Sequence, residues 1–152
     1  MRILGVVLLA GVLSACASNR ADPSLDAEAK LFRAPADKAS IYVIPSSNIA
    51  AVTVAMDGRK VGTLTMENYL RVEVAPGRHV LSVSRAALVP LVFREPRDDV
   101  AVEAEAGHCY FLRAAWKDAG ESLREFRVYW DRMTEDEGRR AVNVRWLMPP
   151  AK

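Results

Sequence analysis

The stretch VTVAMDGRKVG at residues 52–62 decides the fold class of this chain. Its apolar side chains alternate with smaller or polar ones up to Met56, which is the period of a strand that buries one face. Asp57-Gly58 follows at once, and this dipeptide favours a tight hairpin because glycine accepts positive φ at low steric cost. Residues 60–64 resume the alternation. The stretch therefore predicts two antiparallel strands joined by a two-residue turn.

The same period of two continues on both sides of this hairpin. Further strands are predicted at 39–44, 69–74, 78–84, 100–105, 108–116 and 124–130, with at most a short or edge strand at 88–93, beside prolines. In 69–74 the leucine and the two valines are expected to face inward, and Tyr69, Arg71 and Glu73 outward. Seven or eight short strands separated by turn signals indicate an antiparallel β-sandwich in which each sheet has one wet face.

One helix is expected near the C-terminus, at residues 135–144. Thr134 and Glu137 have the spacing of a capping box, in which each side chain bonds a backbone N–H of the other residue. Gly138 weakens such a helix by about 1 kcal/mol relative to alanine. Pro149-Pro150 then begins a short tail.

Composition sets broad limits on the function. The chain has 152 residues, with 21 Lys and Arg against 19 Asp and Glu, and a formal net charge of +2. This length accommodates one domain. The near balance of charge excludes a nucleic-acid binder that works through a broad basic surface. Hydrophobic residues make up 51% of the chain, too many for a disordered protein.

The N-terminus has the pattern of an export signal. Arg2 is followed by an uncharged run at 3–13 and then by Ser14-Ala15-Cys16. The run is too short for a transmembrane helix, since eleven residues rise about 16 Å and the hydrocarbon core measures about 30 Å. Leu13-Ser14-Ala15-Cys16 resembles the lipobox of bacterial lipoproteins. The resemblance implies cleavage between Ala15 and Cys16 and acylation of Cys16.

Several consequences follow for the mature protein. Two or more acyl chains on Cys16 anchor a protein stably in a membrane. Ala17 stands where an Asp usually retains such lipoproteins in the inner membrane, so outer-membrane delivery, facing the periplasm, is implied. The expected organisation is a signal peptide at 1–15, a lipidated Cys with a flexible tether at 16–37, a β-sandwich domain at 38–148 and a tail at 149–152. One or two helical turns are expected within the tether, at 26–32.

Three segments, 52–62, 69–79 and 102–113, carry a family resemblance. They contain a strand with Asp-Gly, an aromatic-led strand with Pro-Gly and a basic residue, and Ala-Gly followed by an aromatic pair. Together they resemble the domain of unknown function 2846 family, small bacterial lipoproteins with a β-sandwich domain. The first two segments are also similar to the PEGA-type surface β-domain. Cys109 departs from the family, which often has an aromatic residue there. The resemblance implies no catalytic residue.

The residues that could carry chemistry are few. His79 and His108 follow turn glycines, where a histidine is usually a surface or turn residue. His108-Cys109 are strand neighbours whose side chains point to opposite faces, which disfavours a metal pair. Cys109 is expected as a buried thiol that forms no intramolecular disulfide once Cys16 is lipidated. The acidic run 135–137 is explained by helix capping without a cation.

Two further groups leave binding open. Arg139-Arg140 with Arg145 form a small basic cluster, expected as a solvated helix face rather than an anion site. Four aromatic residues are expected to pack in the core or cover an edge, although aromatics on a sandwich face also stack on sugars: Trp116, Tyr129, Trp130 and Trp146.

These features predict a non-catalytic envelope lipoprotein that needs no cofactor and no metal. It would contact the membrane through Cys16 and present a face to a protein partner in the periplasm. The alternative is a carbohydrate- or peptidoglycan-binding module, which requires a Trp or Tyr exposed in a shallow groove.

Overall fold

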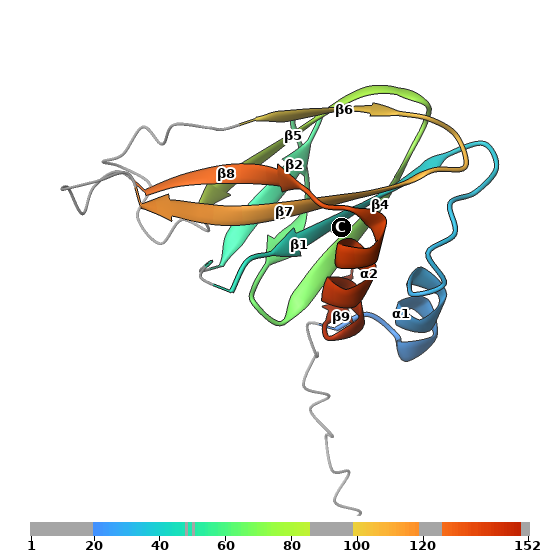
Figure 1. Ribbon diagram of the computed structural model, residues 1–152, viewed down its shortest axis with the longest axis horizontal. Coiled ribbons are helices and arrows are strands. Elements are labelled where there is room, and N and C mark those ends of the chain that lie inside the picture. The colour runs from blue at the N-terminus through green and yellow to red at the C-terminus, as the bar shows by residue number, and fades with distance from the viewer. Residues whose placement is uncertain (1–19, 48, 50, 86–98, 119–125, 150–152) are drawn as a thin grey trace, which may run out of the picture.

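The computed structural model describes residues 20–47, 49, 51–85, 99–118 and 126–149 (Figure 1). Within these residues lie two helices and nine strands, which form two sheets. The predicted β-sandwich is confirmed. The elements are α1 (Pro23–Ala29), β1 (Ala39–Pro45), β2 (Val52–Met56), β3 (Arg59–Leu64), β4 (Asn68–Val74), β5 (Gly77–Arg85), β6 (Val100–Ala104), β7 (Cys109–Asp118), β8 (Phe126–Arg132), α2 (Glu135–Asn143) and β9 (Trp146–Leu147).

The four-stranded sheet has the order β3-β2-β5-β6, and all its pairings are antiparallel. The predicted hairpin is confirmed, with β2 and β3 paired from Val52 with Leu64 to Met56 with Arg59. Both turn residues have positive φ, 49° at Asp57 and 78° at Gly58. Two such residues in sequence give a turn whose twist matches that of the strands, and this sets the register.

The five-stranded sheet has the order β8-β7-β1-β4-β9, and its strands are not all antiparallel. β1 pairs with β7 in parallel, as β4 does with β9. The expectation of purely antiparallel sheets is therefore wrong. Alternation along a strand determines which face it buries, but not the direction of the neighbour that a distant part of the chain supplies.

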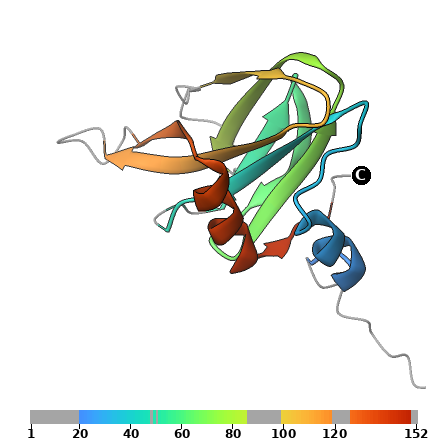
Figure 2. The same cartoon turned by 45° about the vertical axis from the view of Figure 1, so that its right-hand side comes forward.

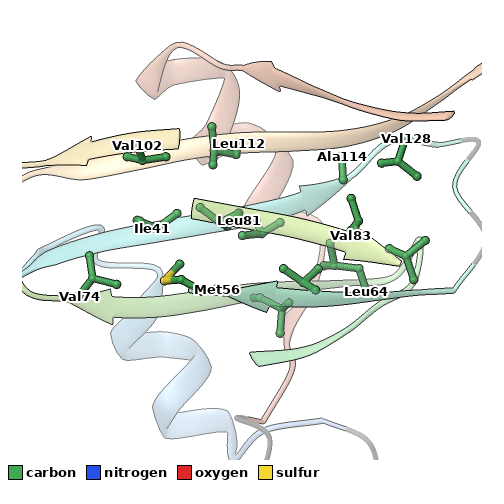
Figure 3. Packing of buried hydrophobic residues seen from close by; sticks show 14 of the residues in the cluster. Ile41, Met56, Leu64, Val74, Leu81, Val83, Val102, Leu112, Ala114 and Val128 are labelled. Atoms are coloured by element: carbon green, nitrogen blue, oxygen red, sulfur yellow. The ribbon is translucent and has the colours of Figure 1, made fainter. Parts of the chain in front are cut away.

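The main core fills the space between the two sheets (Figure 3). Ile41 and Leu112 reach into it from the five-stranded sheet, and Leu81 and Val102 from the four-stranded sheet. Each is at most 2% exposed. Burial of one large aliphatic side chain contributes about 1.5–3 kcal/mol, so this layer is the main source of stability.

A second apolar cluster covers the opposite face of the five-stranded sheet. Tyr42, Tyr69 and Phe111 project from three adjacent strands and are at most 3% exposed. Helices α1 and α2 lie over this face, and Leu147 of the edge strand β9 packs into the same cluster (Figures 1 and 2). The expectations that Tyr69 faces outward to solvent and that each sheet has one wet face are therefore wrong for this sheet.

Part of the expected tether belongs to the fold. Helix α1 starts three residues before the expected 26–32, with Asp22 as N-cap, and Ala29 on it is fully buried. The Tyr42 hydroxyl donates to the Ala29 carbonyl at 2.6 Å. Residues 20–37 thus extend the domain toward the N-terminus. The signal peptide 1–15, Cys16, the segment 88–93 and residues 150–152 lie outside the described residues.

Helix α2 forms as predicted, with one unexpected contact. The capping box is present, since Glu137 N–H donates to Thr134 Oγ1 and Thr134 N–H donates to the Glu137 carboxylate. Gly138 is buried against the Phe111 ring, and a Cβ at this position would lie 2.2 Å from Phe111 Cγ. Glycine weakens the helix but lets it pack this closely on the sheet.

Candidate functional site

A shallow groove of about 360 Å³ opens on the outer face of the five-stranded sheet, beside α2. Its floor comes from the end of β1 and the middle of β7, and its polar rim is formed by Ser46, Arg113, Tyr129 and Arg145. The groove lies where helix α2 stops covering the sheet. Arg113 is ion-paired with Asp131 on the neighbouring strand β8.

The Arg145 side chain in this groove is hydrogen-bonded to backbone carbonyls. Its guanidinium donates to the carbonyls of Met66 at 3.1 Å, Ala141 at 2.6 Å and Pro45 at 3.4 Å. Within the described residues it makes no ion pair. Burial lowers the pKa of Arg145, yet an arginine stays charged at physiological pH. The groove therefore carries a net positive charge.

The three arginines expected as one cluster have separate surroundings. Arg139 is paired with Glu135 and lies over the Phe32 ring, with 5.1 Å between guanidinium carbon and ring centroid. Arg140 is exposed, and Arg145 is fixed at the end of the helix. The solvated-face interpretation holds for Arg140, but Arg145 is a fixed part of the groove.

The four aromatic candidates are similarly divided. Tyr129 is 41% exposed and lines the groove. Trp130 is half-buried and packs against the main core. Trp146 is half-buried beneath Arg20, with 3.7 Å between the guanidinium carbon and the ring centroid. The side chain of Trp116 lies outside the described residues.

His79 is a structural cation that joins two turns. Its Nδ1 lies 2.7 Å from Asp57 Oδ2, and its Nε2 lies 2.9 Å from the Ala75 carbonyl. Both acceptors require an N–H, so the contacts favour the doubly protonated ring. The bond with Asp57 raises the pKa of His79 and lowers that of Asp57. The ring lies between the Asp57-Gly58 turn and the Pro76-Gly77 turn and fastens them together.

His108 and Cys109 do not form a joint site. His108 is exposed, with Nδ1 3.0 Å from the Ala106 carbonyl. The Cys109 thiol is half-buried and donates to the Phe32 carbonyl at 3.4 Å, and burial raises its pKa. Across the described residues, no three His, Cys, Asp or Glu side chains gather closely enough to hold a metal ion.

Asp26 on α1, which is not among the residues that the sequence marks as functional, joins the two ends of the described chain. Its carboxylate accepts from Lys30 Nζ at 2.7 Å, from the Tyr69 hydroxyl at 2.9 Å and from the Leu147 N–H at 2.8 Å. Burial raises the pKa of Asp26, but these bonds outweigh burial and the net shift is downward. No local pattern indicates this role, because the partners lie 43 and 121 residues away.

The described chain enters the fold immediately before this carboxylate. Ala21 N–H donates to the Leu147 carbonyl at 2.9 Å, which places the first described residues beside β9. Lys30 Nζ also donates to the Arg145 carbonyl at 2.7 Å. Helix α1, strand β9 and the C-terminal end of α2 thus meet at one end of the molecule (Figure 1).

Comparison with known proteins gives one match. A family model described as protein of unknown function (DUF2846) matches residues 35–125. No curated protein and no solved structure matches the chain. Neither described helix has the length and apolarity that crossing a membrane demands.

Proposed function

Since the chain belongs to the DUF2846 family of proteins of unknown function, we propose that its mature form is a lipid-anchored lipoprotein of the bacterial cell envelope. Cys16 is the proposed attachment site, with cleavage between Ala15 and Cys16. Ala17 favours delivery to the outer membrane, on its periplasmic side. The observation that carries the proposal is the sequence Leu13-Ser14-Ala15-Cys16 directly after a short apolar run.

The role proposed for the domain is non-catalytic, as an interaction or structural module. The family description names no activity. His79 supports this role, since both its ring nitrogens are engaged by Asp57 and Ala75 and neither is left to act as a base. The remaining exposed surface would serve a protein partner in the periplasm.

Replacement of the proposed anchor tests the proposal directly. The Cys16→Ser variant should accumulate as uncleaved precursor and lose all labelling by radioactive palmitate. Cys109→Ser is the matched control, because it removes the other cysteine and should be labelled and cleaved like the wild type. Palmitate incorporation into Cys16→Ser would contradict the proposal.

The groove supports a second candidate, a glycan- or peptidoglycan-binding module. Tyr129 offers an exposed ring, and the Arg145 guanidinium offers positive charge to a carboxylated sugar or peptide. Tyr129→Ala should weaken binding of purified muropeptides about tenfold, since loss of a central aromatic contact costs more than 1 kcal/mol. Isothermal titration calorimetry measures this. Arg78→Ala, on the four-stranded sheet, should bind like the wild type, and a wild type that binds no muropeptide would contradict this candidate.

A further inference from the structure

We propose that the end of the domain formed by α1, β9 and the C-terminus of α2 rests directly on the membrane surface. This inference depends on the proposed acylation of Cys16. It concerns how the domain is oriented on its membrane, and it specifies the bilayer interface as the partner of this end.

The first argument is the length of chain between anchor and fold. Five residue steps separate Cys16 from Ala21, whose N–H is already bonded to β9. Five steps span at most about 18 Å when fully extended. The headgroup layer itself occupies roughly 5–8 Å of this distance. The end that bears Ala21 is therefore confined to the immediate neighbourhood of the lipid headgroups.

The second argument is the apolar surface at this end. Val144 is 79%, Met66 55% and Leu25 48% exposed. Each lies on a segment that is bonded to β9 or directly precedes it in the chain. Val144 precedes Arg145, and Arg145 Nε donates to the Met66 carbonyl. Leu25 precedes Asp26, which binds the β9 backbone. We call these three side chains the apolar rim. Large apolar side chains exposed together mark interaction surfaces.

The third argument is the pair Trp146 and Arg20. The half-buried indole lies on β9, and the Arg20 guanidinium stacks on it. Tryptophan is enriched at the level of lipid headgroups, where its ring is half in an apolar and half in a polar layer. Arginine suits the same depth, because its stem lies along apolar surface while its charge stays in water. Both side chains thus have the chemistry of an interface.

Charge at this end nearly cancels, so the contact is apolar in origin. The four cations of these segments, Arg20, Lys30, Arg140 and Arg145, are equal in number to the four acidic residues Asp22, Asp26, Glu28 and Glu67, and Lys30 is ion-paired with Asp26. Docking should therefore be insensitive to salt and to the fraction of anionic lipid, unlike the binding of a polybasic segment. A modest apolar rim suffices, because a short tether raises the effective concentration at the surface to about millimolar.

Quenching of tryptophan by brominated lipid tests the orientation. The full-length acylated protein is reconstituted into vesicles of phosphatidylethanolamine and phosphatidylglycerol with brominated acyl chains. A variant with Trp116→Phe and Trp130→Phe reports from Trp146 alone. A variant with Trp116→Phe and Trp146→Phe reports from Trp130, on the opposite edge of the five-stranded sheet. Trp146 emission should be lost, in phosphatidylcholine vesicles and at high salt as well, while Trp130 emission should persist.

A second set of variants separates the rim from the anchor. In the Trp146 reporter, Leu25→Ser with Met66→Ser and Val144→Ser should restore emission without changing palmitate content or co-sedimentation. Tyr129→Ser is the matched control, since Tyr129 is similarly exposed but lies on β8, and it should leave quenching intact. Thermal melting of each variant confirms that it is folded.

The outcomes distinguish the two proposals. A protein without palmitate overturns the proposed anchor and this orientation together. An acylated protein whose Trp146 is not quenched, or is still quenched after the triple substitution, overturns the orientation alone. Protection of Trp146 that requires an added periplasmic protein would make this end a protein interface and would also overturn the orientation.

Discussion

The four-stranded sheet and the five-stranded sheet bury their two faces differently. In the four-stranded sheet, strand β2 alternates buried and half-buried residues, so Thr53 on its outer side keeps partial access to solvent. In the five-stranded sheet, all seven residues of β1 are buried. The first sheet has the pattern of an ordinary half-wet sandwich sheet. The second is the central layer of three, with the main core on one side and the helices on the other.

This difference separates local from remote causes of burial. In the four-stranded sheet, β2 and β3 are consecutive strands paired through a tight turn, and β5 pairs with the next strand, β6. The outer face of the five-stranded sheet is covered by α1, from before the first strand, and by α2, from after β8. The family match at 35–125 encloses β1–β7 but neither helix. The covering layer therefore belongs to the two ends of the described chain.

The largest expected effect comes from removal of an aromatic ring beneath the helices. Phe111→Ala should lower the free energy of unfolding by about 3–5 kcal/mol, because it leaves a cavity between β7 and α2. Thr53→Ala, on the outer side of the four-stranded sheet, should change it by only about 0.5 kcal/mol. Urea denaturation followed by circular dichroism measures both. Similar losses for the two variants would contradict the three-layer interpretation.

The second-largest loss of stability should come from replacing Asp26, whose carboxylate joins the ends of the described chain. Asp26→Asn should cost about 2 kcal/mol at neutral pH, since it removes charge-assisted bonds to Lys30, Tyr69 and Leu147. The folded-state pKa of Asp26 is lowered, so its contribution is present above its ordinary value of 3.8 and is lost as pH falls through the lowered pKa. Wild type and variant should therefore converge in acid, which denaturation at several pH values checks.

Asp22→Asn is the matched control for Asp26. Asparagine caps a helix as well as aspartate does, so this variant should be nearly as stable as the wild type. If Asp22→Asn destabilised the protein as much as Asp26→Asn, the effect would belong to α1 itself and not to its link with β4 and β9.

Gly138→Ala tests the close packing of α2 on the sheet. On an open helix face this change adds about 1 kcal/mol of stability. Here the new Cβ would collide with the Phe111 ring, and overpacking of this kind costs about 1–3 kcal/mol, so a net loss of up to about 2 kcal/mol is expected. In the Phe111→Leu background the loss should shrink, and a double-mutant cycle measures this coupling. Stabilisation by Gly138→Ala would show that the helix can shift away.

The sequence was most informative where the determining residues are neighbours. The Asp57-Gly58 turn and the Thr134–Glu137 capping box were both predicted and are both present. The burial of Tyr69 was missed, because the helices that cover it come from segments far away in the chain. The same reason hid the surroundings of Arg145. Backbone carbonyls hold its guanidinium, and no residue type marks a backbone carbonyl as an acceptor.

Cys16 differs from Tyr69 and Arg145, because its predicted role depends only on its neighbours in the sequence. The lipobox is a short contiguous motif that requires no fold to be recognised, so the sequence alone predicts the site. It lies outside the described residues and stays a prediction. The structure adds the position of Ala21 beside β9, which the expected tether at 16–37 did not anticipate.

The smallest effect should come from the pair His79 and Asp57 on the four-stranded sheet. The pH dependence of this pair should run opposite to that of Asp26. The pKa of His79 is raised, so its contribution is complete below the ordinary value of 6.5 and is lost as pH rises through the raised pKa. The lowered pKa of Asp57 means that the pair also weakens in strong acid, below 3.8. The pair of His79 and Asp57 is therefore strongest between pH 3.8 and pH 6.5.

His79→Gln should cost on the order of 1 kcal/mol near pH 5.5, because Asp57 is half exposed and solvent screens the pair. The difference from the wild type should shrink as the pH is raised toward 9, since the neutral imidazole no longer donates to both Asp57 and Ala75. Thermal melts across this pH range measure it. His108→Gln, at an exposed turn, is the control and should change stability little at any pH. A His79→Gln deficit that grows above pH 7 would mean that the neutral ring makes the stabilising contact, and the assignment of a structural cation to position 79 would be wrong.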